Sequence, residues 1–118
     1  MPRRSQEFYR GISFQPPAPV AAAARRALER RAQQSPSQRG MTPVGLARVR
    51  QLLHRQELSP TTIDRMVSYF ARHTIDKQGS SWGAYGKGRQ AWDGWGGDPG
   101  LRWARSIARR MEAAERRA

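Results

Sequence analysis

The chain has no cysteine among its 118 residues. Disulfide bonds and thiolate metal sites are therefore excluded, which fits a reducing compartment or an assembly that needs no covalent cross-links. Long apolar runs are also missing. The longest, residues 16–24, begins with prolines and is too short to span a bilayer. We therefore expect no membrane partner.

Negative charge is scarce: 9 Asp and Glu face 22 Lys and Arg, for a formal net charge of +13. Lysine is also rare, since all the cations except Lys77 and Lys87 are arginines. Arginine suits planar recognition of phosphates or carboxylates, although codon usage in a GC-rich genome would give the same bias. The charge predicts an acidic partner: nucleic acid, an acidic protein surface or, as the least favoured alternative, anionic lipid.

No segment alternates apolar and polar residues as a half-buried strand would, so we predict an all-α fold. Helix starts are indicated at Thr42-Pro43, Ser59-Pro60 and Asp98-Pro99, where a capping side chain precedes proline. The predicted organisation is an extended arm at 1–18, an Ala/Arg-rich helix at 19–34, a linker at 35–41, and a domain of three main helices, one short helix and a Trp/Gly-rich loop at 42–118.

The helix predicted to follow Ser59 has the clearest apolar period, with Ile63, Met66 and Phe70 on one face. A short connection predicts that it forms a hairpin with the helix before it. Polar and outward positions are assigned to Arg48 on the first of these helices. On the second they are assigned to Thr61, Thr62, Arg65, Ser68, Tyr69 and Arg72.

All four tryptophans lie in the glycine-rich stretch 82–103. Indoles bury a large apolar area and glycines allow close approach, so we favour a structural core element over a ligand pocket. Asp98 is expected to cap the last helix. Asp93 is expected to accept a hydrogen bond from an indole N–H or from an arginine.

The N-terminal region is predicted to be separate from this domain. Phe8, Tyr9, Ile12 and Phe14 follow no helical period, so the arm is either disordered or laid along a partner with these side chains as anchors. The next helix carries four arginines that form either a solvated face or an acidic docking face: Arg25, Arg26, Arg30 and Arg31.

Residues that could carry catalysis are few. His54 and His73 have no His or Glu four residues along, so no metal site is expected. The glycines around Lys87 lack the preceding strand and the Lys-Ser/Thr pair of a phosphate-binding loop. We expect no enzymatic activity and no cofactor.

Residues 59–73, 76–77 and 90–104 resemble a small domain that recurs in tailed-phage and prophage proteins. The shared pattern includes R-M-x-S-Y-F-x-R-H followed by A-W-x-x-W-G-G-D-x-G-x-x-W-A. The signature residues of this segment are taken to define the fold and not a catalytic site: Arg65, Met66, Arg72, His73, Trp82, Trp92, Trp95, Gly96, Gly97, Asp98 and Trp103.

The resemblance implies a head-associated phage protein. We expect a non-enzymatic virion protein of the minor capsid or cement type, located in the virion and, during assembly, in the host cytoplasm. Its partner would be the major capsid protein or another virion protein with an acidic surface, in an oligomeric assembly. The alternative is a small basic DNA-binding protein that is packaged with the genome.

Overall fold

The computed structural model describes residues 3–118, and all regular structure in this range is helical. The prediction of an all-α fold is confirmed. Met1 and Pro2, the first residues of the predicted arm, lie outside the described residues. The elements are α1 (Ala18–Ala32), α2 (Pro43–Leu53), α3 (Pro60–His73), α4 (Lys87–Gly94) and α5 (Gly97–Arg117), with short 3₁₀ helices η1 (Pro36–Gln38) and η2 (Thr74–Gln78).

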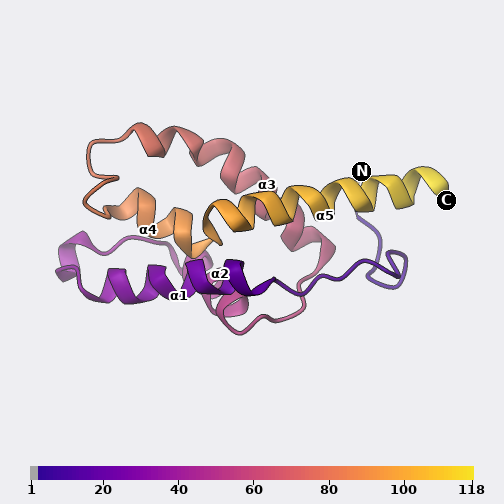
Figure 1. Ribbon diagram of the computed structural model, residues 1–118, viewed down its shortest axis with the longest axis horizontal. Helices are drawn as coiled ribbons and strands as arrows, with labels where there is room; N and C mark the ends of the chain where they lie inside the picture. The colour runs from indigo at the N-terminus through magenta and orange to yellow at the C-terminus, as the bar shows by residue number, and fades with distance from the viewer. Residues whose placement is uncertain (1–2) are drawn as a thin grey trace.

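The molecule is elongated, measuring 50 × 27 × 22 Å along its principal axes. The longest helix, α5, follows the long axis, with α1 on one side and α3 on the other (Figure 1). α1 packs against α4, α2 and α5, and α3 packs against α5. Arg3, the first described residue, lies beside the C-terminal part of α5, where it pairs with Glu115.

Two helix starts follow the sequence signals. The hydroxyl oxygen of Thr42 accepts a hydrogen bond from the backbone N–H of Gly45 at 3.1 Å, and proline occupies the first turn of α2. The hydroxyl oxygen of Ser59 accepts from the N–H of Thr62 at 3.1 Å, again with proline in the first turn. Each cap satisfies a backbone donor that has no partner within its own helix.

The predicted hairpin of α2 and α3 is wrong. α2 packs on α1 and α4, whereas α3 packs on α5. Three side chains that were assigned outward positions are also buried: Arg48, Thr62 and Tyr69 are 6%, 8% and 5% exposed. Tyr69 is covered because Trp95 stacks on its ring at 4.5 Å, a contact between residues that helical periodicity cannot relate.

The N-terminal segment does not form a free arm. Tyr9 and Phe14 are each 1% exposed and belong to the same hydrophobic core as Phe70 and Trp92. Phe8 and Ile12 are partly buried and pack against that core. The expectation that these four side chains are free to anchor a partner is therefore wrong, because the chain buries them against its own helices.

Polar contacts hold this segment in place. The backbone N–H of Leu58 donates to the carbonyl of Phe14 at 3.0 Å. The side chain of Gln6 donates to the carbonyl of Leu58 at 2.6 Å, and the guanidinium of Arg55 donates to the carbonyl of Pro16 at 2.8 Å. The loop between α2 and α3 therefore supplies backbone and side-chain partners to a stretch that has no helix of its own.

The predicted domain boundary at residues 35–41 is also wrong. The small side chains of Val20, Ala24 and Ala27 are buried in α1, and α1 packs closely against α4. The fully buried Gln90 of α4 accepts from the N–H of Gly40 at 2.7 Å and donates to the carbonyl of Gln38 at 3.1 Å. The linker is thus fixed to the core, and residues 3–118 form one folded unit.

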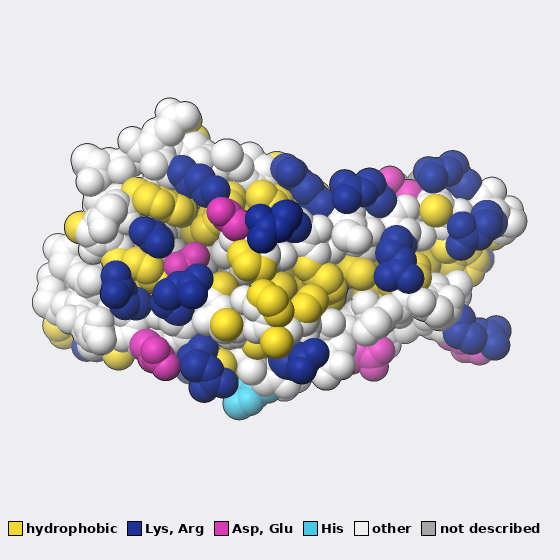
Figure 2. Space-filling model, viewed as in Figure 1, with side chains coloured by type: hydrophobic (Ala, Val, Ile, Leu, Met, Phe, Trp, Pro, Cys, Tyr) yellow, Lys and Arg dark blue, Asp and Glu magenta, His cyan; other side chains and the backbone are white. Residues whose placement is uncertain are grey.

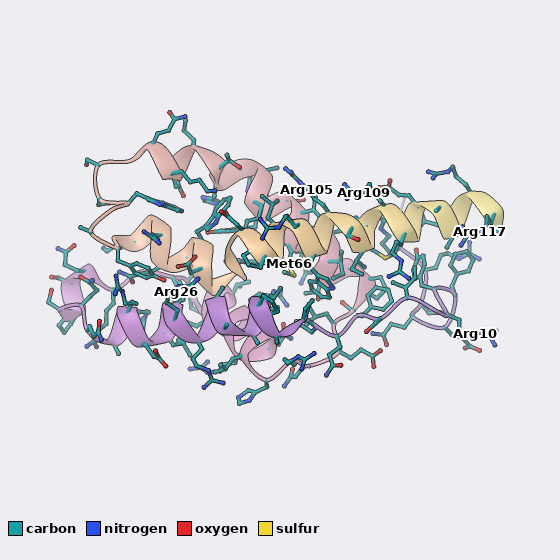
Figure 3. The ribbon with its side chains drawn as sticks, in the orientation of Figure 1. Arg10, Arg26, Met66, Arg105, Arg109 and Arg117 are labelled. Carbon is teal, nitrogen blue, oxygen red and sulfur yellow. The ribbon has the colours of Figure 1, made fainter. Side chains whose placement is uncertain are left out.

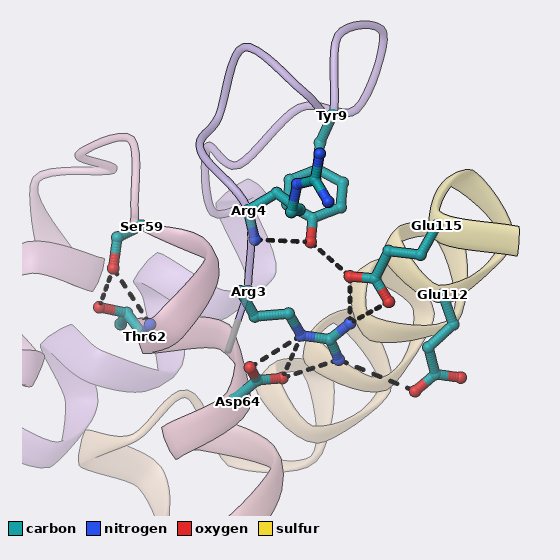
Figure 4. A network of polar contacts seen from close by, with 8 residues as sticks. All are labelled: Arg3, Arg4, Tyr9, Ser59, Thr62, Asp64, Glu112 and Glu115. Carbon is teal, nitrogen blue, oxygen red and sulfur yellow. Dashed lines mark hydrogen bonds and ion pairs between the residues drawn. The ribbon is translucent and has the colours of Figure 1, made fainter. Parts of the chain in front are cut away.

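A cluster of ionic contacts ties the N-terminus to α3 and α5 (Figure 4). The guanidinium of Arg3 lies 2.8 Å from the carboxylate of Asp64 and 2.9 Å from that of Glu115. The hydroxyl of Tyr9 donates to Glu115 and accepts from the N–H of Arg4 at 3.0 Å. Glu112 approaches Arg3 at 3.8 Å.

This cluster makes the stability of the fold depend on pH in the acid range. Hydrogen bonds from Tyr9 and Arg3 hold the pKa of Glu115 below its ordinary value of 4.5. Because the folded-state pKa is the lower one, the stabilisation is present above 4.5 and is lost as the pH falls through the folded-state pKa. We expect Glu115→Gln to lower the melting temperature at neutral pH and to have a smaller effect in acid.

The matched control is Glu57→Gln, because Glu57 is exposed and forms no ion pair within residues 3–118. Melting temperatures measured by circular dichroism across the acid range compare the two variants with the unaltered chain. If the Glu115→Gln and unaltered curves run parallel down to the lowest pH, then Glu115 does not contribute as described.

Candidate functional site

The tryptophan–glycine stretch is structural. Trp92 is 1% exposed, and its indole N–H donates to the carboxylate of Asp98 at 3.0 Å. Its ring meets Phe70 edge-on at 4.8 Å and Trp82 at 6.0 Å. Trp103 is partly buried against the same core. These contacts favour the core interpretation of the indoles over the ligand-pocket interpretation.

The turn between α4 and α5 is built on glycines with positive φ. Gly96 has φ +113° and Gly97 has φ +65°. Gly96 is the N-cap of α5, so the expectation that Asp98 caps this helix is wrong. Asp98 lies in the first turn instead, where it accepts from Trp92 and from the ammonium of Lys77 at 2.8 Å. The Lys77 contact is the main cause that lowers the pKa of Asp98.

Asp93 is 5% exposed and pairs with arginine side chains, which is one of the two alternatives that the sequence left open. Its carboxylate lies 3.4 Å from the guanidinium of Arg26 and 3.9 Å from that of Arg89. It also accepts from the hydroxyl of Tyr85, and burial raises the pKa of that phenol. The site joins α1 to α4 and contributes to the fold.

The arginines of α1 are mostly engaged within the chain. Arg26 pairs with Asp93, and Arg30 lies 4.8 Å over the ring of Tyr85. Arg31 donates to the carbonyl of Gly40 at 2.8 Å. Arg25 makes no such contact within residues 3–118. The sequence-predicted docking face of α1 is therefore partly occupied by contacts to α4 and the linker.

The arginines of α5 take part in fewer contacts within the described residues than those of α1. Arg102, Arg105, Arg109 and Arg116 recur at a spacing that places them along one side of the helix. All four are exposed, and none forms an ion pair with a carboxylate in the part of the chain that the structure describes. Arg105 and Arg109 follow one another along α5 (Figure 3). Cationic side chains lie on both sides of a hydrophobic band on this face of the molecule (Figure 2).

A cleft of about 950 Å³ lies between the 40–44 segment, α3 and α4. Apolar side chains of Met41, Val44, Ala91 and Trp95 contribute to its walls. The outward side of α3 supplies most of its polar lining. The charged residues and the histidine of the cleft are Arg39, Asp64, Arg65, Arg72, His73, Asp76 and Lys87.

A stack of rings forms one wall of the cleft. Tyr69 is stacked on Trp95 at 4.5 Å and on His73 at 4.5 Å, so both of its faces are covered. The guanidinium of Arg48 lies over the ring of Trp95 at 5.2 Å. The hydroxyl of Tyr69 and the Nε of Arg48 are buried with no hydrogen-bond partner among residues 3–118. Burial raises the pKa of Tyr69.

The two carboxylates of the cleft are already engaged. Asp64 pairs with Arg3, and Asp76 lies 3.0 Å from Nδ1 of His73. His73 is thus hydrogen-bonded to a residue three positions along the chain. No hydroxyl or amine side chain within residues 3–118 hydrogen bonds to His73, so the His73–Asp76 pair has no adjoining nucleophile.

The sequence signature and the cleft overlap. Met66 is fully buried in the core, but Arg65, Arg72 and His73 line the cleft. Sequence reasoning missed this site because its three walls come from separate segments. The sequence did contain one signal that pointed to the cleft: the arginines on the outer side of α3 share that helix with Tyr69.

Comparisons with known proteins give no match: no family model, no curated protein and no solved structure is similar to this chain. None of the helices within residues 3–118 combines the length and the hydropathy that a membrane-spanning segment needs. The same residues contain no group of three or more His, Cys, Asp or Glu that could hold a metal ion.

Proposed function

We propose that this chain is a non-enzymatic structural protein of a tailed-phage virion, of the minor capsid or cement type. It binds an acidic neighbouring subunit, for which the major capsid protein or another virion protein is the proposed partner. The observation that carries the proposal is a row of exposed arginines on α5 that form no ion pair within residues 3–118: Arg102, Arg105, Arg109 and Arg116.

The arginine row suits a contact with an acidic protein surface. Exposed guanidinium groups gain charge-assisted, bidentate hydrogen bonds when they meet carboxylates. They are held on a 21-residue helix whose far end is tied to Arg3 through Glu115. A rigid presentation lowers the ordering cost of binding.

The resemblance of 59–73 and 90–104 to head-associated phage domains supports the choice of a virion as the assembly. The structure changes the mode of binding that we propose. With Tyr9 and Phe14 buried in the core, contact falls to the folded surface and not to an N-terminal arm.

Mass spectrometry of purified, nuclease-treated virions tests the proposal. We expect peptides of this chain at a fixed ratio to the major capsid protein. Virions made with Arg105→Glu and Arg109→Glu combined should contain less of the chain. The control is Arg50→Glu, which reverses an exposed charge on α2, away from the row. Absence of the unaltered chain from virions would reject the proposal.

The alternative is a basic protein packaged with the genome, which the same arginine row favours. A salt titration separates the two. Each contact with a DNA phosphate makes the affinity for DNA fall more steeply as the salt concentration rises. If the virion proposal is right, rising salt should release DNA from the chain at concentrations at which the chain stays bound to capsids. Loss of the chain together with the DNA when virions are emptied of their genome would favour the alternative.

A further inference from the structure

The cleft between the 40–44 segment, α3 and α4 has an excess of unneutralised positive charge. Arg65, Arg72 and Lys87 are exposed and form no ion pair within residues 3–118. Arg39 donates to two carbonyls of the 32–34 stretch, which leaves its charge uncompensated. Asp64 is paired with Arg3, and Asp76 pairs with His73, which carries a charge only when protonated. Asp76 therefore offsets one of these positive charges, and the cleft keeps a net positive charge.

A buried cation next to the cleft adds to this excess. Arg48 is 6% exposed, and it hydrogen bonds to Gln51 but to no carboxylate in the described residues. Burial and the charge of Arg65 both lower the pKa of Arg48. A buried charge without a counter-ion is costly, so an anion bound beside Arg65 would relieve it.

The cleft also offers contacts for one apolar side chain. Val44, at its edge, is 58% exposed, one of two large hydrophobic residues in the described chain with high exposure. Met41 and Ala91 continue the apolar lining toward Trp95.

Nucleic acid fits this lining less well. Single strands bind by stacking bases on open aromatic faces. Here Tyr69 is covered on both faces by His73 and Trp95, and Trp95 is covered by Tyr69 and Arg48. The cleft therefore presents cations and aliphatic surface but few free ring faces.

We infer that this cleft docks an acidic segment of a protein partner that carries one apolar side chain. Its carboxylates meet Arg65, Arg72 and Lys87, and its apolar side chain packs between Val44, Met41 and Ala91. The inference rests on the proposed function for the choice of a protein partner, and it adds a specific docking site to the arginine row of α5.

The test is binding of a labelled peptide made of glutamates around one leucine to the full chain, measured by fluorescence anisotropy. We expect Arg72→Glu to weaken binding about tenfold or more, because it removes one charge contact and adds a repulsive one. Arg50→Glu is the matched control, since both arginines are exposed and lie in the last turn of their helices. It should change the affinity by no more than about threefold.

A second variant and a second peptide test the apolar part. Val44→Glu places a negative charge at the cleft edge without touching the core, so it should weaken peptide binding. It keeps the inference testable if the Arg72→Glu variant does not fold. Replacing the leucine of the peptide by serine should weaken binding to the unaltered chain. Equal binding of both peptides would overturn the inference, as would equal effects of Arg72→Glu and Arg50→Glu.

Other occupants give different results. An oligothymidine that binds more tightly than the peptide and is selectively lost in Arg72→Glu would assign the cleft to nucleic acid and overturn the inference. A dimer of the chain that Val44→Glu dissociates in sedimentation would assign it to a second copy, with the same consequence. Peptide binding does not require virions, so absence of the chain from virions rejects the proposed function separately.

Discussion

Gly96→Ala is expected to lower the free energy of unfolding by roughly 2–5 kcal/mol, combining backbone strain with overpacking. Gly96 has φ +113°, a conformation that side-chain-bearing residues rarely adopt. A Cβ at this position would lie 2.9 Å from Cα of Gly100 and 2.9 Å from Cγ1 of Val20. The first of these atoms is backbone inside α5, so it cannot move aside without disturbing the helix.

Gly83→Ala is the control for this prediction. It makes the same chemical change in the same glycine-rich stretch, but a Cβ at Gly83 meets nothing within 4 Å and the backbone has no positive φ. Its effect should stay within about 0.5 kcal/mol, as for ordinary surface substitutions. Urea denaturation of both variants measures the difference. Similar small effects would show that the Gly96 turn is not constrained as described.

This turn also shapes the cleft. Gly96 follows Trp95, and Trp95 stacks on Tyr69 and contributes to the cleft wall. A variant that relaxes the turn would shift the indole and weaken peptide binding as well as stability. The stabilising core and the proposed docking site therefore share a side chain.

Phe14→Ala is expected to cost about 3–5 kcal/mol, the usual range for removing a buried aromatic side chain. Phe14 is 1% exposed and its ring meets that of Tyr9 at 6.2 Å. If residues 3–17 were a free arm, the substitution would leave stability unchanged, since a side chain in water contributes little to folding.

The control for Phe14→Ala is Ile75→Ala, which trims a large apolar side chain that is 63% exposed. We expect it to change the unfolding free energy by less than about 0.5 kcal/mol. Equal effects of the two variants in urea denaturation would contradict the packing of the N-terminal segment.

Local signals in the sequence predicted much of the helical framework. Thr42 and Ser59 cap their helices through side-chain hydrogen bonds, and Ile63, Met66 and Phe70 face the core as their spacing indicates. These features depend on residues a few positions apart, so they can be found without knowledge of the tertiary structure.

Contacts between distant segments were not predictable in the same way. Phe14 has no helical period, and its partner Leu58 lies 44 positions along, so nothing local indicated that the N-terminal segment docks. The stacking of Trp95 on Tyr69 reversed the expected exposure of Tyr69. The cleft was missed for the same reason, because its walls become neighbours only once α4 has packed beside α3.

The central structural claim is that the N-terminal segment belongs to the folded core. Hydrogen exchange of the Leu58 amide in the full chain tests this most directly. Leu58 lies outside the helices, and its N–H donates to the carbonyl of Phe14 at 3.0 Å. We predict that this amide is protected about as strongly as those in the middle of α3. Exchange at the rate of an unprotected amide, with α3 and α5 still protected, would contradict the account.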